Sequence, residues 1–223
     1  MFNNKTLYVA VLAIAATFFA ALMALSVKYL SGDLNPIMIC FYRCVAGLIL
    51  LSPFIAKNNF AAVKSKNFKF QFIRALINII SMICWFTALG TMHLEKATAL
   101  GFTTPLFTTI LAVILLGEVI RFHRTTALII GFIGIFIIIR PGYIPLETGT
   151  ILMLIASLSF SFVLIFVKKL SAVDSSLTII FYHLLISTPI FFILSIFYWQ
   201  NININQLIIF TFIGGSGLLS HWC

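Results

Sequence analysis

The sequence predicts an all-α integral membrane protein, and its composition and its long apolar runs both lead to this fold class. Of the 223 residues, 62% are hydrophobic and 9% are charged, whereas a soluble domain carries roughly 25% charged residues. Apolar runs of roughly 20 residues, the length that crosses about 30 Å of hydrocarbon as a helix, recur along the whole chain. The runs are continuous rather than alternating, which favours helices over strands.

Eight of these runs are expected to span the bilayer as helices, because lipid offers no hydrogen-bond partner to an open backbone. The loops around the third and fourth runs are short, so neighbouring helices there are predicted to be antiparallel. The expected spans cover residues 7–27, 36–55, 72–92, 97–116, 125–139, 149–167, 176–199 and 206 to the end.

The net charge of +9 is interpreted as loop charge that faces an anionic membrane surface, not as a nucleic-acid site. Ten Lys and Arg residues fall in the loops on one face of the expected bundle, and three fall on the other. Since positive loops stay in the cytoplasm, we expect a multi-pass protein of the bacterial inner (plasma) membrane with a cytoplasmic N-terminus. Its expected surroundings are the lipid bilayer, with no nucleic-acid partner.

A repeat with an offset of 140 residues indicates the architecture. The run KYLS at 28–31 recurs as KKLS at 168–171, and FYR at 41–43 recurs as FYH at 181–183. Over the 32 residues that begin at Ala15, 8 are identical to their counterparts at this offset. Identity alone is weak in so apolar a chain, and the equivalent placement of the cation and of the FY motif carries more weight.

A first repeat of five spans, residues 7–139, crosses the membrane an odd number of times, so its second copy must insert upside down. Inverted repeats are common in secondary transporters, which bind substrate near the membrane midplane between the copies, although channels also use them. Residues 149–223 hold only three spans of an incomplete second repeat. We therefore expect inverted five-helix repeats of a ten-helix transporter, with about eight helices present in a truncated chain.

Short motifs in the second to fifth expected spans resemble a known family. They are Phe41-Tyr42-Arg43, the stretch from Trp85 through Ala88-Leu89 and Ala97 to Pro105, Leu116-Gly117-Glu118, and Gly131 to Pro141. Their order and spacing resemble the EamA-type permeases of the drug/metabolite transporter superfamily, including S-adenosylmethionine uptake proteins.

The resemblance implies a secondary transporter (permease) that moves a small metabolite across the inner membrane by alternating access. Members carry amino acids, nucleotide-like metabolites such as S-adenosylmethionine, sugar phosphates and drugs. The resemblance therefore does not identify the substrate of this chain. A non-transporting membrane remnant or scaffold protein is the alternative, because a repeat without its last two helices leaves one wall of the pathway missing. We therefore expect poor transport by the chain alone unless it forms a homodimer or pairs with a separately made fragment.

Arg43, His183 and Trp85 are candidates for lining a substrate pathway. A cation two turns inside a span costs about 3 kcal/mol, which favours a role for Arg43 inside the bundle, with snorkelling to the interface as the alternative. His183 is its repeat mate and could titrate near neutral pH, although a lone histidine on an apolar helix more often packs. Trp85 could stack on a planar ligand or pack within the bundle.

The fourth expected span supplies the other pathway candidates. Pro105 breaks the backbone hydrogen-bond ladder and frees carbonyls that could face a substrate or merely kink the helix. The hydroxyls of Thr104 and Thr108 could face the substrate as well, or bond the carbonyls of their own helix.

Charged residues at helix ends are given structural roles. Glu118 is expected to pair with Arg121 or Arg124, with proton coupling as the alternative, and Lys168 is expected to anchor its helix at lipid headgroups. The sequence shows no catalytic set, metal-type cluster or phosphate loop. We therefore predict that the protein is not an enzyme and that it holds no cofactor or metal.

Overall fold

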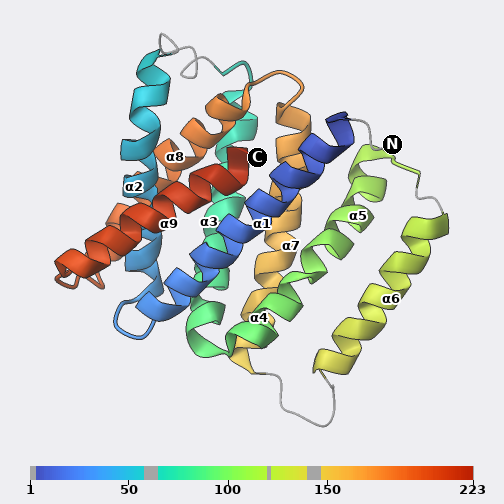
Figure 1. Ribbon diagram of the computed structural model, residues 1–223, viewed down its shortest axis with the longest axis horizontal. Coiled ribbons are helices and arrows are strands. Elements are labelled where there is room, and N and C mark those ends of the chain that lie inside the picture. Colours follow the sequence, from blue (N-terminus) through green and yellow to red (C-terminus); the bar gives the residue numbers. More distant parts are fainter. Residues whose placement is uncertain (1–3, 58–64, 120–121, 140–146, 223) are drawn as a thin grey trace. The chain divides into compact units, whose positions relative to one another are not determined.

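The structure is a computed structural model that describes residues 4–57, 65–119, 122–139 and 147–222. Within these ranges the chain forms nine helices and no strand (Figure 1), which confirms the all-α class. The helices are α1 (Asn4–Leu30), α2 (Pro36–Lys57), α3 (Phe68–Thr91), α4 (Leu94–Gly101), α5 (Thr103–Leu116), α6 (Phe122–Ile139), α7 (Thr148–Leu170), α8 (Ser176–Ile196) and α9 (Ile204–Trp222).

The chain divides into two compact units, and the first is built from both ends of the sequence. It comprises residues 1–66 and 174–223 and therefore holds α1, α2, α8 and α9. Helix α9 packs along both α1 and α2, and α2 also packs against α8 (Figure 1).

Small residues let the helices of the first unit approach closely. A Cβ atom built on Gly47 of α2 would lie 3.1 Å from Leu184 of α8, and one built on Gly214 of α9 would lie 2.8 Å from Ala46 Cβ. The glycines on α2 and α9 therefore set the spacing of three helices, as small residues commonly do between transmembrane helices.

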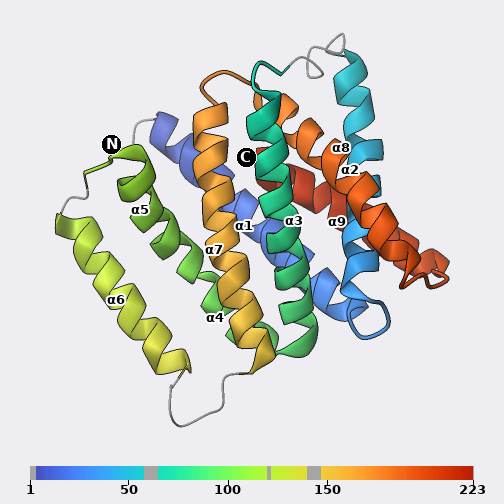
Figure 2. The same cartoon turned by 180° about the vertical axis from the view of Figure 1, so that it is seen from behind.

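The second unit, residues 67–173, is organised around α7. Helix α3 packs along one side of α7, and the consecutive helices α4 and α5 also contact it, with α6 against α4 and α5 (Figure 2). Ile165 of α7 is buried in a cluster with Leu111 and Ala112 of α5. The Ser81 hydroxyl of α3 donates to Ala156 O of α7 at 2.9 Å, so α7 receives both apolar and polar contacts from its neighbours.

The fourth expected span is not one continuous helix. Helix α4 ends at Gly101 and α5 begins at Thr103, with Phe102 in a turn between them. In an unbroken helix the ring of Pro105 would meet the carbonyl of residue 101, which is where α4 ends. Pro105 itself falls in the first turn of α5, where its missing N–H leaves no hydrogen bond unmade.

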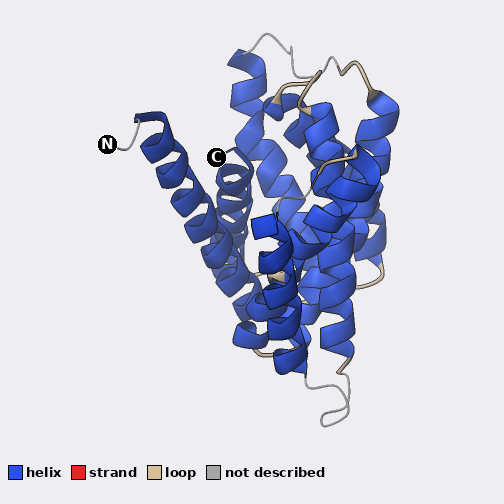
Figure 3. Ribbon diagram, turned by 90° about the vertical axis from the view of Figure 1, so that its right-hand side faces the viewer, coloured by secondary structure: helices blue, strands red, loops and turns tan. Residues whose placement is uncertain are grey.

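Several helices are long and apolar enough to cross a membrane. By length and composition five candidates meet this condition among the described residues, with α4 and α5 counted together as Leu94–Leu116. Shorter apolar helices cover Ile14–Leu30, Thr125–Ile137 and Ile204–Leu218, in three of the regions where spans are predicted. Figure 3 shows the helical character of both units.

Replacing Gly214 by alanine should destabilise the first unit, because the new methyl group would lie 2.8 Å from Ala46 Cβ and 3.0 Å from Gly47 N. Such overpacking typically costs about 1–3 kcal/mol, which exceeds the about 0.5–1 kcal/mol that alanine gains over glycine in a helix. The melting temperature of the purified protein in detergent should fall. Gly215→Ala is the matched control, since its methyl group would meet Leu50 Cδ1 at an ordinary 3.5 Å. Equal melting temperatures for the two variants would contradict this packing.

Candidate functional site

The predicted pathway residues fall into two groups, one in each unit. Arg43 and His183 belong to the first unit, whereas Trp85, Thr104, Pro105 and Thr108 belong to the second. In the second group, Thr104, Pro105 and Thr108 lie on α5, whereas Trp85 lies on α3.

Arg43 is a buried cation held between two helices of the first unit. Its side chain is on α2, the residue is only 7% exposed, and its guanidinium lies against Gly217 of α9. A Cβ atom built on Gly217 would be 3.1 Å from Arg43 Nη2. Glycine at this position therefore makes the room that the guanidinium occupies, and any other residue would push against it.

His183 lies on α8 near the place where α8 meets α2. It is 4% exposed, and its Nδ1 atom is 3.2 Å from the hydroxyl of Ser187, one turn further along the same helix. Leu184, the next residue, packs against Gly47, which is one turn after Arg43. The contact between α2 and α8 thus brings the two predicted residues into one region of the first unit.

Aromatic rings beside Arg43 form a cluster that the sequence alone does not indicate. Tyr42 stacks on Phe210 of α9 with ring centroids 4.9 Å apart, and Trp199 lies 6.3 Å from Tyr42 and 6.2 Å from Phe41. Phe41 also lies 5.6 Å from Phe192 of α8. The FY motif was recognised as a repeat, but the rings that close on it come from residues about 150 or more positions away.

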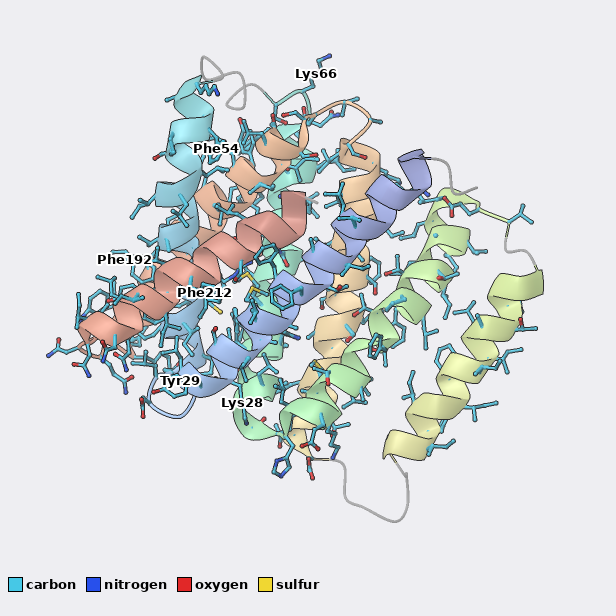
Figure 4. The ribbon with its side chains drawn as sticks, in the orientation of Figure 1. Lys28, Tyr29, Phe54, Lys66, Phe192 and Phe212 are labelled. Carbon is cyan, nitrogen blue, oxygen red and sulfur yellow. The ribbon has the colours of Figure 1, made fainter. Side chains whose placement is uncertain are left out.

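Two hollows lie in the first unit. An open cavity of about 310 Å³ is lined by Asn35 and residues 196–200, which include Trp199 of the aromatic cluster. A groove of about 510 Å³ between α1, α2 and α9 has mostly apolar walls, lined by Phe19, Leu50, Ile208, Thr211, Phe212, Gly215 and Ser216. Phe212 is labelled on α9 in Figure 4. Cavities of about 300–1,000 Å³ are typical of small-ligand sites.

The helix break in the second unit has its own polar environment. The Ser161 hydroxyl of α7 lies 3.0 Å from Thr104 O and 2.7 Å from Ser157 O, so its proton can serve either carbonyl. Thr103 is fully buried, and its hydroxyl oxygen has no hydrogen-bond partner among the described residues. The Thr108 hydroxyl donates to Thr104 O at 2.8 Å, as expected if it bonds its own helix.

Trp85 makes an aromatic contact, whereas Glu118 makes an ion pair. Trp85 of α3 is partly buried, and its ring lies edge-on to that of Phe86 at 5.1 Å. Glu118 follows the end of α5 and forms an ion pair with Lys168 of α7. The expected partners of Glu118 cannot be compared with this, because Arg121 and the side chain of Arg124 lie outside the described residues. Lys168 therefore bonds a carboxylate in addition to any headgroup that it reaches.

A second ion pair joins the same two helical segments at their other ends. Lys96 of α4 lies 2.9 Å from Glu147, which caps the start of α7. Helices α4 and α5 are thus fastened to α7 near both ends by ion pairs and near the break by Ser161. Each exposed ion pair contributes about 0–1 kcal/mol, so the contacts near the break are the ones most sensitive to mutation.

Ser161→Ala should lower the free energy of unfolding by about 1 kcal/mol, because Thr104 O loses its donor on the neighbouring helix. The measurement is denaturant unfolding in detergent micelles. Thr98→Ala is the control, since that exposed hydroxyl bonds only carbonyls of its own helix, Leu94 O and Glu95 O, at 2.9 Å. A loss for Thr98→Ala as large as that for Ser161→Ala would show that Ser161 does not join the two helices.

Comparison with known proteins points to membrane transport. Residues 7–140 match the EamA-like transporter family. The S-adenosylmethionine uptake transporter of Rickettsia prowazekii is 28% identical over 190 residues, which cover 85% of this chain and 65% of that protein. The riboflavin transporter of Vibrio cholerae is 30% identical over 164 residues (72% and 55%). The pseudopaline exporter CntI of Pseudomonas aeruginosa is 24% identical over 178 residues (79% and 62%).

Proposed function

The chain belongs to the EamA-like transporter family, and we propose that it forms the substrate pathway of a secondary transporter for small metabolites. Its apolar helices and its transporter relatives make it a multi-pass membrane protein of a bacterial transporter type rather than an enzyme. The chain spans 65% of the length of the Rickettsia prowazekii relative. Alternating access, the inner-membrane location and the substrate are all parts of the proposal.

The main support for this proposal is that Arg43, a cation, is buried inside an apolar helix. It lies seven residues into α2, about 10 Å along the helix axis from Pro36. Insertion of a charge at the centre of a membrane helix costs about 2.5–3.5 kcal/mol. A substrate carboxylate would return part of that cost through a charge-assisted hydrogen bond.

The surroundings of Arg43 favour a substrate with an acidic end and a planar ring. A guanidinium binds a carboxylate with fixed geometry, and the nearby rings of Tyr42, Phe210 and Trp199 offer stacking surfaces. S-adenosylmethionine has both groups, an amino-acid carboxylate and an adenine base. It is therefore the first substrate to test, as the Rickettsia relatives also suggest.

Contacts within each unit support inverted repeats over residues 7–139 and 149–223. The turns after α1 and α7 start with equivalent hydrogen bonds, Ser31 N to Val27 O at 2.9 Å and Ser171 N to Val167 O at 2.8 Å. If the offset of 140 relates the halves, α3 is the counterpart of α9 and α7 that of α1. The packing of α3 on α7 then matches the packing of α9 on α1.

A reporter fused after Lys66 should be found in the cytoplasm, and one fused near Asn203 should be found in the periplasm. The reason is that basic loops stay on the cytoplasmic side. In Figure 4, Lys66 and Lys28 lie at opposite ends of the first unit, as this topology requires. The measurement is the activity of paired phosphatase and β-lactamase or fluorescent fusions. The opposite pattern would overturn the proposed orientation.

Arg43→Ala should reduce uptake of S-adenosylmethionine into proteoliposomes by about tenfold or more, because loss of a hydrogen bond to a charged group costs about 1.5–3 kcal/mol. Binding of S-adenosylmethionine to the purified protein should weaken to a similar extent. Lys57→Ala is the control, since Lys57 is an exposed cation at the end of the same helix. Riboflavin has a planar ring but no carboxylate, so any uptake of riboflavin should respond much less to Arg43→Ala.

If the unmodified chain neither binds nor takes up S-adenosylmethionine, the substrate assignment is wrong. If no member of a panel of amino acids and nucleotide-like metabolites binds the purified chain, and samples that contain the homodimer also give no saturable uptake, the proposal fails as a whole. The oligomeric state of the reconstituted protein is measured in the same samples, so that transport by a homodimer is separated from transport by the monomer.

A further inference from the structure

One ring of the aromatic cluster in the first unit also lines a cavity. The cluster consists of Phe41, Tyr42, Phe192, Trp199 and Phe210. Phe41 and Phe210 are 9% and 1% exposed, whereas Trp199 is 51% exposed. Of these five residues, Trp199 is the one that lines the open cavity of about 310 Å³ at the end of α8. It therefore joins the buried part of the cluster to a space that a ligand can enter.

The segment that carries Trp199 is held at both ends by hydrogen bonds. Tyr198 N donates to Ser195 O at 3.0 Å, which closes the turn after α8. Asn203 N donates to Gln206 Oε1 at 2.9 Å, which ties the segment to the first turn of α9. The indole ring also packs on its neighbours in the cluster. Its position is thus set by the fold before any ligand arrives, which lowers the cost of ordering a binding site.

The lining of the cavity supplies polar atoms but no charge. The lining residues are Asn35, Ile196, Phe197, Tyr198, Trp199 and Gln200. Asn35 Oδ1 accepts a hydrogen bond from Ile37 N at 3.0 Å, which caps α2 and orients the side-chain amide. An ionised ligand group would find no opposite charge among these residues. Amide groups can instead donate to and accept from the neutral nitrogen and oxygen atoms at the edge of a ring.

This cavity is separate from the guanidinium of Arg43. Phe210, which stacks on Tyr42, precedes Gly217, which contacts Arg43, by seven residues of α9. Seven residues of helix span about 10 Å. Trp199 lies beyond the end of α8 and before the start of α9. A ring that stacked on Trp199 would therefore be bound nearer to the helix ends than a carboxylate that paired with Arg43.

We propose that the cavity is an outer binding site for a planar heteroaromatic ring, such as a nucleobase, which stacks on Trp199. Its volume is at the lower end of the range of about 300–1,000 Å³ that is typical of small-ligand sites, which suits one ring system. The inference rests on the proposed function in one respect. The proposed topology places this loop on the periplasmic side, where a substrate for uptake first meets the protein.

Binding of radiolabelled adenosine to the full chain in lipid nanodiscs tests the site, because adenosine has a planar base and no carboxylate. Trp199→Ala should weaken binding about tenfold or more, since the stacking of a base on an aromatic side chain is lost. Phe54→Ala is the matched control and should bind adenosine as the wild type does. Phe54 is also an aromatic residue of the first unit with 51% exposure, and it lies toward the end of the unit marked by Lys66 (Figure 4). Methionine, which has a carboxylate but no ring, should not displace adenosine.

Tryptophan fluorescence reports on the stacking itself. Adenosine should change the emission of the wild type, and Trp199→Phe should lose this change while it keeps most of the affinity. This variant retains a ring against Phe41 and Tyr42, so it also decides the question if Trp199→Ala does not fold. The outer site would be overturned by an emission change that persists in Trp199→Phe, by equal affinities of the wild type and a folded Trp199→Ala, or by a wild type that does not bind adenosine.

Uptake measurements separate this inference from the proposed function. In proteoliposomes, Trp199→Ala should raise the KM for S-adenosylmethionine about tenfold and leave the maximal rate nearly unchanged, because the outer site acts on capture. A wild type that binds adenosine through Trp199 but does not take up any metabolite would support the outer site and refute the transporter. Saturable uptake by a protein whose adenosine binding does not depend on Trp199 would refute the outer site and leave the transporter standing.

Discussion

Hydrocarbon supplies no hydrogen bonds, and this constraint determines how the polar groups of the chain are arranged. Backbone groups are paired within helices, and most hydroxyls bond their own helix, as Ser26 does with Leu22 O and Thr188 with Leu184 O. The ion pairs seen in the described residues lie at helix ends. A buried polar side chain that contacts another helix is therefore an exception, and Arg43 is such an exception.

The fold could be predicted largely from apolar runs, because their length and continuity are properties of single helices. The helix break at Phe102 was foreseen only through Pro105, since proline acts on the residue four positions earlier. The pairing of Glu118 with Lys168 was not foreseen. It depends on α5 and α7 ending side by side, and nearby arginines in sequence were the more obvious partners. The sequence thus predicts effects within one helix, whereas it does not predict contacts between helices that are distant in sequence.

The sequence draws attention to Arg43, but it gives no sign of the neutral residues Ser161 and Gly217, which contact the candidate residues in the structure. Arg43 is conspicuous in an apolar helix, because a charge there is costly. Ser161 and Gly217 are unremarkable in the same setting, yet one contacts the helix break and the other makes room for the guanidinium. Both residues matter because they lie where two helices come close together. The sequence of one helix does not show where such a contact will form.

The contact between Arg43 and Gly217 also has a consequence for biosynthesis. Gly217 is made 174 residues after Arg43, which at synthesis rates of about 5–20 residues per second means a delay of roughly 9–35 s. During that interval α2 carries its cation without the surface of α9 that later encloses it. The nascent helix must keep Arg43 near water or inside the insertion machinery until α9 is made, so the first unit is completed only after α9 has been synthesised.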